Sequence, residues 1–198
     1  MARTLLDILQ MPSEASRLSE STLLVIDAQR EYLDGKLPLT GVHAALEQIA
    51  RLQARARSLG APVVHVVHHA PTGAGIFDPQ SEYGQIIASV APQGDEVVVA
   101  KNYPNSFTES KLADVLASHG RKNLIVVGFM THMCVSATTR AGMDRGFNLT
   151  VVDGACATRD LPDGKGGQIS ADLIHRANLA ALADLVATIA GGDGDIPD

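Results

Sequence analysis

Several features that are common in other protein classes are scarce or absent in this sequence, and each absence excludes a class of protein. Among its 198 residues only Cys134 and Cys156 are cysteines, which is too few for a disulfide framework. No apolar run is long enough to cross a bilayer. The first ten residues are interrupted by Asp7 and lack the small-residue cleavage site of a signal peptide. We therefore expect a cytoplasmic protein that does not engage a membrane.

Positive charge is also scarce. The chain has 16 Lys and Arg residues against 22 Asp and Glu residues, a formal net charge of −6, and no basic run. This balance argues against nucleic acid as a partner. A chain of this length can bury about 70% of its unfolded surface in one core. We therefore expect residues 1–198 to form a single domain.

Short β-branched runs alternate with longer amphipathic stretches, a pattern typical of βαβ units around a parallel sheet. The strands are expected at residues 23–27, 62–68, 96–101, 124–128, 149–153 and, more weakly, 185–189. Helices are expected at 42–59, 108–119 with Thr108 as the cap, 134–145 and 169–184. Residues 71–81 and 161–167 are predicted loops, and 191–198 a frayed tail. The fold class is α/β, a three-layer αβα sandwich with a mostly parallel, about six-stranded sheet.

Three reactive side chains follow the ends of predicted strands. Asp27 ends the first strand, Lys101 ends the third, and Cys134 follows the fourth where a helix is expected to begin. In open α/β sheets ligands bind beyond the carboxyl ends of the strands. The helix dipole is expected to lower the pKa of the cysteine thiol from its free value of about 8.5 and favour the nucleophilic thiolate. Asp27 would act as a general base, and Lys101 would stabilise both other groups.

Taken singly, these residues have more common explanations. A lone cysteine is more often a small buried apolar residue, Asp27 could cap a turn, and Lys101 could be an ordinary surface charge. Cys156 is expected to be structural. The backbone N–H groups around Met130 and Cys134 are placed, by position alone, to donate to a developing oxyanion.

The seven histidines raise the possibility of a metal site. His65, His68 and His69 lie close together, but there is no HExxH or CxxC motif and no nearby acidic partner. We therefore expect no metal and no cofactor: His65 and His68 pack or form hydrogen bonds, and His69 lines the rim of the cleft. His132 is the histidine expected to touch a substrate, unless it is a solvent-facing turn residue. The sequence also lacks the glycine motifs of dinucleotide-binding and phosphate-binding loops.

Three motifs in order resemble those of the isochorismatase-like cysteine hydrolases, a family that includes nicotinamidases, N-carbamoylsarcosine amidases and isochorismatases. An aspartate followed by glutamine and an aromatic residue matches Asp27, Gln29 and Tyr32, and a lysine followed by serine and an aromatic residue matches Lys101, Ser106 and Phe107. The third motif, Gly-x-x-Thr-x-x-Cys-Val-x-x-Thr, matches at Gly128, Thr131, Cys134, Val135 and Thr138. The resemblance covers residues 20–190 or so.

The resemblance implies a catalytic triad of Asp27, Lys101 and Cys134, a cis peptide bond between Phe129 and Met130, and oxyanion donors at the N–H groups of Met130 and Cys134. It implies hydrolysis of a C–N bond in a small amide, ureido or lactam-like substrate through a cysteine thioester. It also implies a homodimer or homotetramer. The pocket walls are expected to come from the loops that follow the strands, at Gln29, Tyr32, His69, Tyr103, Phe107, His132 and residues near Phe77.

Two alternatives to amide hydrolysis remain open. Nicotinamidases carry an Asp-x-His metal motif where residues 68–72 here read His-His-Ala-Pro-Thr, so neither a metal nor nicotinamide specificity is expected. True isochorismatases cleave a vinyl ether, which needs only the acid, and that reaction is one alternative. A non-catalytic, redox-responsive thiol protein is the other.

Overall fold

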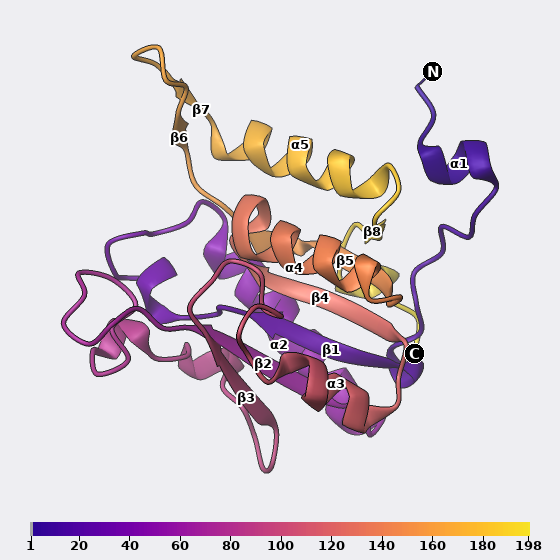
Figure 1. The fold of residues 1–198 in the computed structure, drawn as a ribbon, viewed down its shortest axis with the longest axis horizontal. Helices are drawn as coiled ribbons and strands as arrows, with labels where there is room; N and C mark the ends of the chain where they lie inside the picture. Colours follow the sequence, from indigo (N-terminus) through magenta and orange to yellow (C-terminus); the bar gives the residue numbers. More distant parts are fainter. Residues whose placement is uncertain (1) are drawn as a thin grey trace.

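Six strands form one sheet in the computed structural model, which describes residues 2–198 (Figure 1). Their order across the sheet is β3-β2-β1-β4-β5-β8, and all five pairings are parallel. The strands are β1 (Ser21–Ile26), β2 (Val63–His68), β3 (Val97–Lys101), β4 (Asn123–Phe129), β5 (Asn148–Ala157) and β8 (Thr188–Ala190). The predicted fold class and strand number are confirmed, although the last strand begins three residues later than expected.

Helices cover both faces of the sheet. Helix α2 (Val42–Ser58) lies on one face, and α3 (Leu112–His119), α4 (Ser136–Asp144) and α5 (Ala171–Ala183) lie on the other (Figure 1). Each face therefore has its own apolar core. Alternate residues of β1 serve the two cores: Leu23 and Val25 pack toward α2, whereas Leu24 and Ile26 pack toward the other three helices. This is why the whole of β1 is buried.

The remaining elements are short. They are α1 (Leu5–Leu9), the hairpin of β6 (Leu161–Pro162) and β7 (Gln168–Ile169), and the 3₁₀ turns Leu18–Glu20, Arg30–Tyr32, Glu82–Gly84, Ala88–Val90 and Asp193–Asp195. The segment 161–167, predicted as a loop, therefore begins with one strand of a small hairpin. Within residues 2–198 there is no helix of the length and apolarity needed to cross a membrane.

The predictions for the start of α3 and for the carboxyl-terminal segment were wrong. Helix α3 begins at Leu112 with Lys111 at its N-cap, not at Thr108, because Glu109 takes a left-handed conformation (φ 49°) that breaks a helix. The carboxyl-terminal segment is docked and not frayed. Ile196 is only 1% exposed, and the Arg55 guanidinium of α2 donates hydrogen bonds to the carbonyl oxygens of Asp193 and Ile196.

The strand order reverses at β1. Its two neighbours, β2 and β4, are reached by crossovers over opposite faces of the sheet, through α2 and α3 respectively. At such a switch point the loops that follow the strands separate and leave a crevice. Asp27 directly follows β1, and Phe129 ends β4, so the candidate residues lie at this point of the sheet.

Candidate active site

The cysteine lies in a tight turn between β4 and α4. The turn, Thr131–Val135, is a single π-helical turn that continues directly into α4, and the peptide bond between Phe129 and Met130 before it is cis. Gly128 allows β4 to approach β1 closely here. Its φ is +113°, and a Cβ atom at this position would lie 2.0 Å from the carbonyl oxygen of Ile26. Only glycine fits both conditions.

The three reactive side chains meet behind this turn. The Lys101 ammonium donates a hydrogen bond of 2.7 Å to Asp27 Oδ2 and one of 3.4 Å to Cys134 Sγ. Asp27 and Lys101 are fully buried, and Cys134 is 5% exposed. Asp27 follows β1, Lys101 ends β3 and Cys134 lies in the turn after β4, so the sheet topology brings together groups that are spread over more than a hundred positions of the chain.

A fourth side chain, which the sequence did not single out for this site, completes the cluster. His68 Nδ1 lies 3.2 Å from Lys101 Nζ. His68 ends β2, the strand between those that carry Asp27 and Lys101. Its main chain is held by the buried side-chain amide of Gln29, which accepts from the His68 N–H and donates to the His68 carbonyl oxygen. The sequence shows that β2 ends in a polar residue, but it does not show that the His68 side chain points toward Lys101.

The thiol is not acidified, contrary to the expectation from the helix dipole. Burial, followed by the charge of Asp27, raises the pKa of Cys134 to about 12, and Lys101 only partly offsets this. Burial also raises the pKa of the Asp27 carboxyl, against the lowering influence of Lys101. The Cys134 sulfur is therefore a thiol at neutral pH, and it lies beside the hydrogen-bonded pair of Asp27 and Lys101.

Asp27 is unusual in two further respects. Its φ of 50° places a non-glycine residue in the left-handed region, which costs about 1–3 kcal/mol and is found mainly at functional sites. Its Oδ1 atom is buried and has no hydrogen-bond partner within residues 2–198. A carboxylate oxygen without a donor retains its capacity to take up a proton.

Two of the residues predicted to line the pocket have structural roles instead. Gln29 is fully buried, and its amide is occupied by the backbone of His68 and Gly84, so it is not available to a substrate. Phe107 is 6% exposed and belongs to the core. Its ring stacks on Phe147 at 6.2 Å, and the Arg145 guanidinium lies 4.5 Å from its centroid. In both cases the amide or aromatic position of a motif stabilises the loops around the site, and a place for these residues in the pocket wall stays a prediction.

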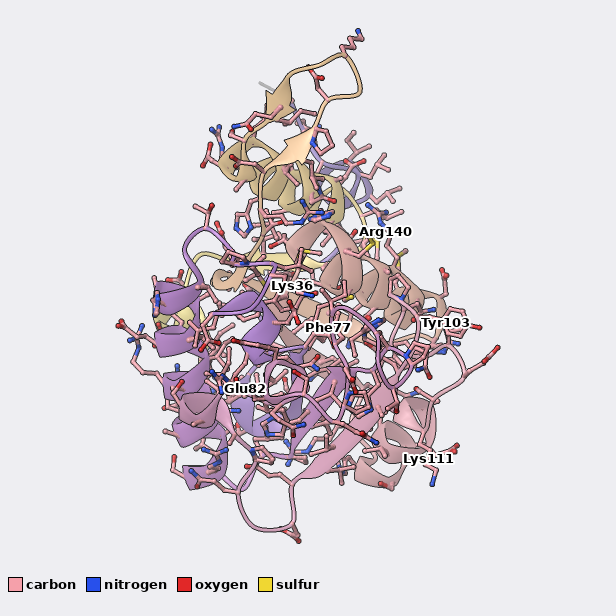
Figure 2. The ribbon with its side chains drawn as sticks, turned by 90° about the vertical axis from the view of Figure 1, so that its left-hand side faces the viewer. Lys36, Phe77, Glu82, Tyr103, Lys111 and Arg140 are labelled. Carbon is pink, nitrogen blue, oxygen red and sulfur yellow. The ribbon has the colours of Figure 1, made fainter. Side chains whose placement is uncertain are left out.

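Phe77 brings the loop 71–81 over the site. It is 6% exposed, and its ring meets those of Tyr32 (5.1 Å) and His68 (5.2 Å) edge to face. Figure 2 looks onto the end of the sheet where the strands finish, and there Phe77 lies near the centre while Tyr103 lies toward the margin. Tyr103 is 44% exposed.

The two remaining predicted wall residues are half-buried. The His69 N–H donates to the carbonyl oxygen of Lys101, and His132 Nδ1 hydrogen-bonds the Thr158 hydroxyl. Burial lowers the pKa of His132, so this imidazole is neutral at physiological pH.

Hydrogen bonds hold the cysteine turn from two sides. On one side the Thr138 hydroxyl donates to Ser106 Oγ and accepts from the Ser106 N–H, which fixes the segment after Lys101 to α4. On the other side Thr131 Oγ1 lies 2.8 Å from Nδ1 of His175 on α5, and the opposite ring nitrogen lies 2.6 Å from Asp153. Three of the motif residues, Ser106, Thr131 and Thr138, thus position the nucleophile's turn or its neighbours.

The described residues hold no cluster of three or more His, Cys, Asp or Glu side chains able to bind a metal ion. His65, one of the three clustered histidines, lies away from the site and pairs with Glu96 at 2.9 Å. His68 points instead to Lys101. The expectation that both form hydrogen bonds is confirmed.

Comparisons with known proteins agree with this architecture. The family model described as "Isochorismatase domain" matches residues 21–192. A crystal structure of an isochorismatase from Pseudomonas putida KT2440 superposes with a TM-score of 0.94 at 40% identity, covering 99% of this chain and all of that one. The "secreted isochorismatase effector" Isc1 of Verticillium dahliae is 37% identical over 92% of this chain and 93% of its own. A maleamate amidohydrolase of P. putida is 35% identical over 66% of this chain and 68% of its own.

Proposed function

The chain belongs to the isochorismatase family and is a cysteine hydrolase, and we propose that it cleaves the carbon–nitrogen bond of a small amide through a thioester on Cys134. The observation that carries this proposal is the buried cluster in which one ammonium joins the Asp27 carboxylate and the Cys134 sulfur. Both the substrate class and the catalytic roles below are part of the proposal.

In the first stage Asp27 is the general base. Its Oδ1 atom, which has no hydrogen-bond donor, takes the thiol proton as Sγ attacks the substrate carbonyl carbon. A carbon–sulfur bond forms and the carbonyl oxygen becomes an oxyanion, to which the N–H groups of Met130 and Cys134 donate. The proton then passes from Asp27 to the nitrogen, the carbon–nitrogen bond breaks, and the amine leaves.

In the second stage the same carboxylate removes a proton from water, and the resulting hydroxide attacks the thioester carbon. The carbon–sulfur bond breaks, the carboxylic acid is released, and the sulfur recovers its proton from Asp27. Lys101 stays charged throughout. It stabilises the thiolate as it forms and thereby opposes the effect of burial on Cys134.

The high thiol pKa favours this route over a redox role. A redox-sensing cysteine is typically accessible and ionised. Cys134 is 5% exposed, and its pKa is raised to about 12, so it would react with oxidants slowly unless a bound substrate brings the base into action.

Residues around the buried cluster suit a small substrate. We propose that Tyr32, His69, His132 and, more peripherally, Tyr103 bound the space in front of Cys134, and that Phe77 closes it. A mixture of aromatic rings and imidazoles suits a small polar or unsaturated amide, ureide or lactam. The maleamate amidohydrolase relative acts, by its name, on a substrate of that kind.

The test is a screen for ammonia or amine release from small amides, ureides and lactams by the purified protein. Cys134→Ser should lose at least about a thousandfold in kcat/KM. Cys156→Ser, at the other buried cysteine, is the matched control and should keep most of the activity. Mass spectrometry should find an acyl adduct on Cys134 after rapid quenching. If Cys134→Ser retains most of the activity, vinyl-ether hydrolysis by Asp27 alone becomes the better explanation and the thioester route is wrong.

We also propose that the chain assembles as a homodimer or homotetramer, because two neighbouring surfaces expose apolar side chains without a partner within residues 2–198. Helix α1 is attached to the end of α5 by hydrogen bonds from Leu5 and Leu6 to Asp184 (Figure 1). The exposed apolar residues of the two helices are Leu5, Ile8 and Leu9 on α1 and Leu173, Ala177, Ala180 and Ala181 on α5.

A second copy fits this surface. On each copy the large exposed side chains of this surface lie at the two ends of α5, and alanines lie between them. Antiparallel packing of two α5 helices would therefore set Leu173 of each copy against alanines of the other. Light scattering should give at least twice the mass of one chain. Ala177→Arg should reduce this to the mass of one chain, whereas Ala117→Arg on the exposed side of α3 should not. A wild-type protein that is monomeric would contradict the proposal.

The cytoplasmic location stays a proposal as well. Both cysteines are free thiols, and the proposed reaction needs Cys134 reduced. The Verticillium relative is described as secreted, so the two proteins need not share a location. Cell fractionation decides the question, and recovery of the protein from the growth medium would contradict it.

A further inference from the structure

We propose that His68 is a positioning residue for the reaction: its Nδ1 atom accepts a hydrogen bond from the third N–H of the Lys101 ammonium and keeps that cation directed at Asp27 and Cys134. The inference rests on the proposed thioester route, in which Lys101 stabilises the forming thiolate. It adds a fourth member to a cluster that the sequence motifs describe as a triad.

The contacts of the buried Lys101 ammonium account for all of its protons. A lysine ammonium has three N–H donors and no acceptor, and a buried ammonium needs a partner for each of them. Lys101 is fully buried. Its three neighbours are Asp27 Oδ2 at 2.7 Å, His68 Nδ1 at 3.2 Å and Cys134 Sγ at 3.4 Å. Each ammonium proton therefore has one acceptor, and His68 Nδ1 is the nitrogen among the three acceptor atoms.

The contact with Lys101 fixes the state of the imidazole. For Nδ1 to accept a hydrogen bond from the Lys101 ammonium, the ring must be neutral and carry its hydrogen on Nε2. Burial, followed by the charges of Lys101 and His69, lowers the pKa of His68 to about 4, in agreement with a neutral ring. The other ionisable groups that face the cluster are Asp27, Cys134 and Tyr32, and burial together with the charges of Asp27 and Cys134 raises the pKa of Tyr32.

Two neighbours hold the His68 imidazole in place. The Gln29 side-chain amide fixes the His68 backbone on both sides, and the Phe77 ring meets the imidazole edge to face at 5.2 Å. The direction of Nδ1 is thus set by β1, β2 and the loop 71–81 together. A side chain restrained this thoroughly is suited to keep Lys101 in one rotamer through both stages of the reaction.

Two substitutions with the same number and branching of side-chain heavy atoms separate this role from simple packing. His68→Asn places an amide oxygen where it can replace Nδ1 as acceptor, whereas His68→Leu fills the same space without an acceptor. The probe is the rate of Cys134 alkylation by iodoacetamide at about pH 8, where that rate follows the thiolate fraction. Mass spectrometry separates Cys134 from the buried Cys156.

Loss of one hydrogen bond to a charged group should reduce the thiolate fraction by about five- to tenfold. We expect His68→Leu to slow alkylation by that factor and His68→Asn to stay within about twofold of the wild-type rate. In hydrolysis, His68→Leu should lower kcat more than it raises KM, because the interaction matters most when the thiolate forms. Nitrogen-15 shifts should show the Nε2–H tautomer of His68 across the neutral range.

The alkylation series does not depend on a substrate, so failure of the two proposals can be distinguished. If no amide is hydrolysed but the Leu and Asn variants differ as expected, the amidase proposal fails and the role of His68 stands. If amides are hydrolysed but both variants alkylate at the same rate, the His68 inference is wrong. An Nδ1–H tautomer would also overturn it, since Nδ1 would then be a donor facing another donor.

Discussion

Replacing Lys101 with methionine would leave the carboxylate of Asp27 buried without its cation. The two charges lie 2.7 Å apart and are both fully buried. At an effective dielectric of about 20 their attraction is about 6 kcal/mol, much of which is offset in the intact protein by the cost of desolvating both groups. Removing one partner of such a pair typically destabilises a protein by about 3–5 kcal/mol. For a chain of this length that corresponds to a melting temperature lower by roughly 10 °C.

The assay is urea unfolding of the wild type, Lys101→Met, Asp27→Asn and the double variant. Lys165→Met is the matched control, because Lys165 is an exposed residue of the β6–β7 turn. We expect the control to change stability by less than about 0.5 kcal/mol. The double variant should lose at least about 1 kcal/mol less than the sum of the single losses, since it leaves no unpaired charge.

The pH dependence gives an independent check with a definite sign. Without Lys101 the pKa of Asp27 rises further. The folded Lys101→Met protein therefore binds a proton at a pH where the unfolded chain does not, because the unfolded chain binds it only as the pH falls to the ordinary aspartate pKa of about 3.9. The destabilisation should therefore be largest at neutral pH and shrink as the pH falls toward 4 or so. Additive single losses, or a loss that does not vary with pH, would refute the view of a buried pair whose members depend on each other.

Three further outcomes follow from other parts of the structure. Gly128→Ala should lower the free energy of unfolding in urea by more than about 3 kcal/mol, because its Cβ would collide with the β1 backbone. Gly146→Ala, at a position with positive φ but open space, should lower it by about 1–2 kcal/mol. Equal losses of stability would argue against the collision. Burial would raise the pKa of Glu96, but hydrogen bonds led by that from Arg57 hold this pKa at about 2. The wild type therefore keeps the resulting stability above pH 4.5 or so and loses it toward pH 2, and Glu96→Gln should remove it. A Glu96→Gln variant as stable as the wild type at neutral pH would contradict this. Because the pKa of Asp27 is raised, hydrolysis should begin to decline with falling pH above the ordinary carboxyl pKa of about 3.9, and a rate unchanged down to about pH 4 would exclude Asp27 as the base.

Much of the fold followed from the sequence because its information is local. Alternating β-branched runs and helical periodicities are properties of neighbouring residues, and they located the principal strands and helices to within a few positions. The order of the motifs then placed Asp27, Lys101 and Cys134 at one rim, since all parallel strands end on the same side of their sheet. That residues 1–198 form a single isochorismatase-like domain stays a prediction.

The carboxyl-terminal segment and Gln29 differ from expectation for a shared reason: each depends on a partner distant in sequence. The segment 191–198 looks polar and loop-like, but Arg55 of α2 holds it and Ile196 is buried against the body. Gln29 resembles a substrate ligand until its amide is found on the His68 backbone. A hydrogen-bonding group does not reveal from sequence which of many partners will satisfy it.

By itself, therefore, the sequence determined the layer architecture, the family and the rim on which the reactive groups gather. The tertiary structure alone decided how those groups interact. The helix-dipole argument considered one element and predicted an acidic thiol, whereas burial from every side leaves Cys134 protonated. In the same way only the folded sheet turns His68 toward Lys101. Desolvation and hydrogen-bond geometry depend on the summed environment of a group, and that environment exists only after distant strands have come together.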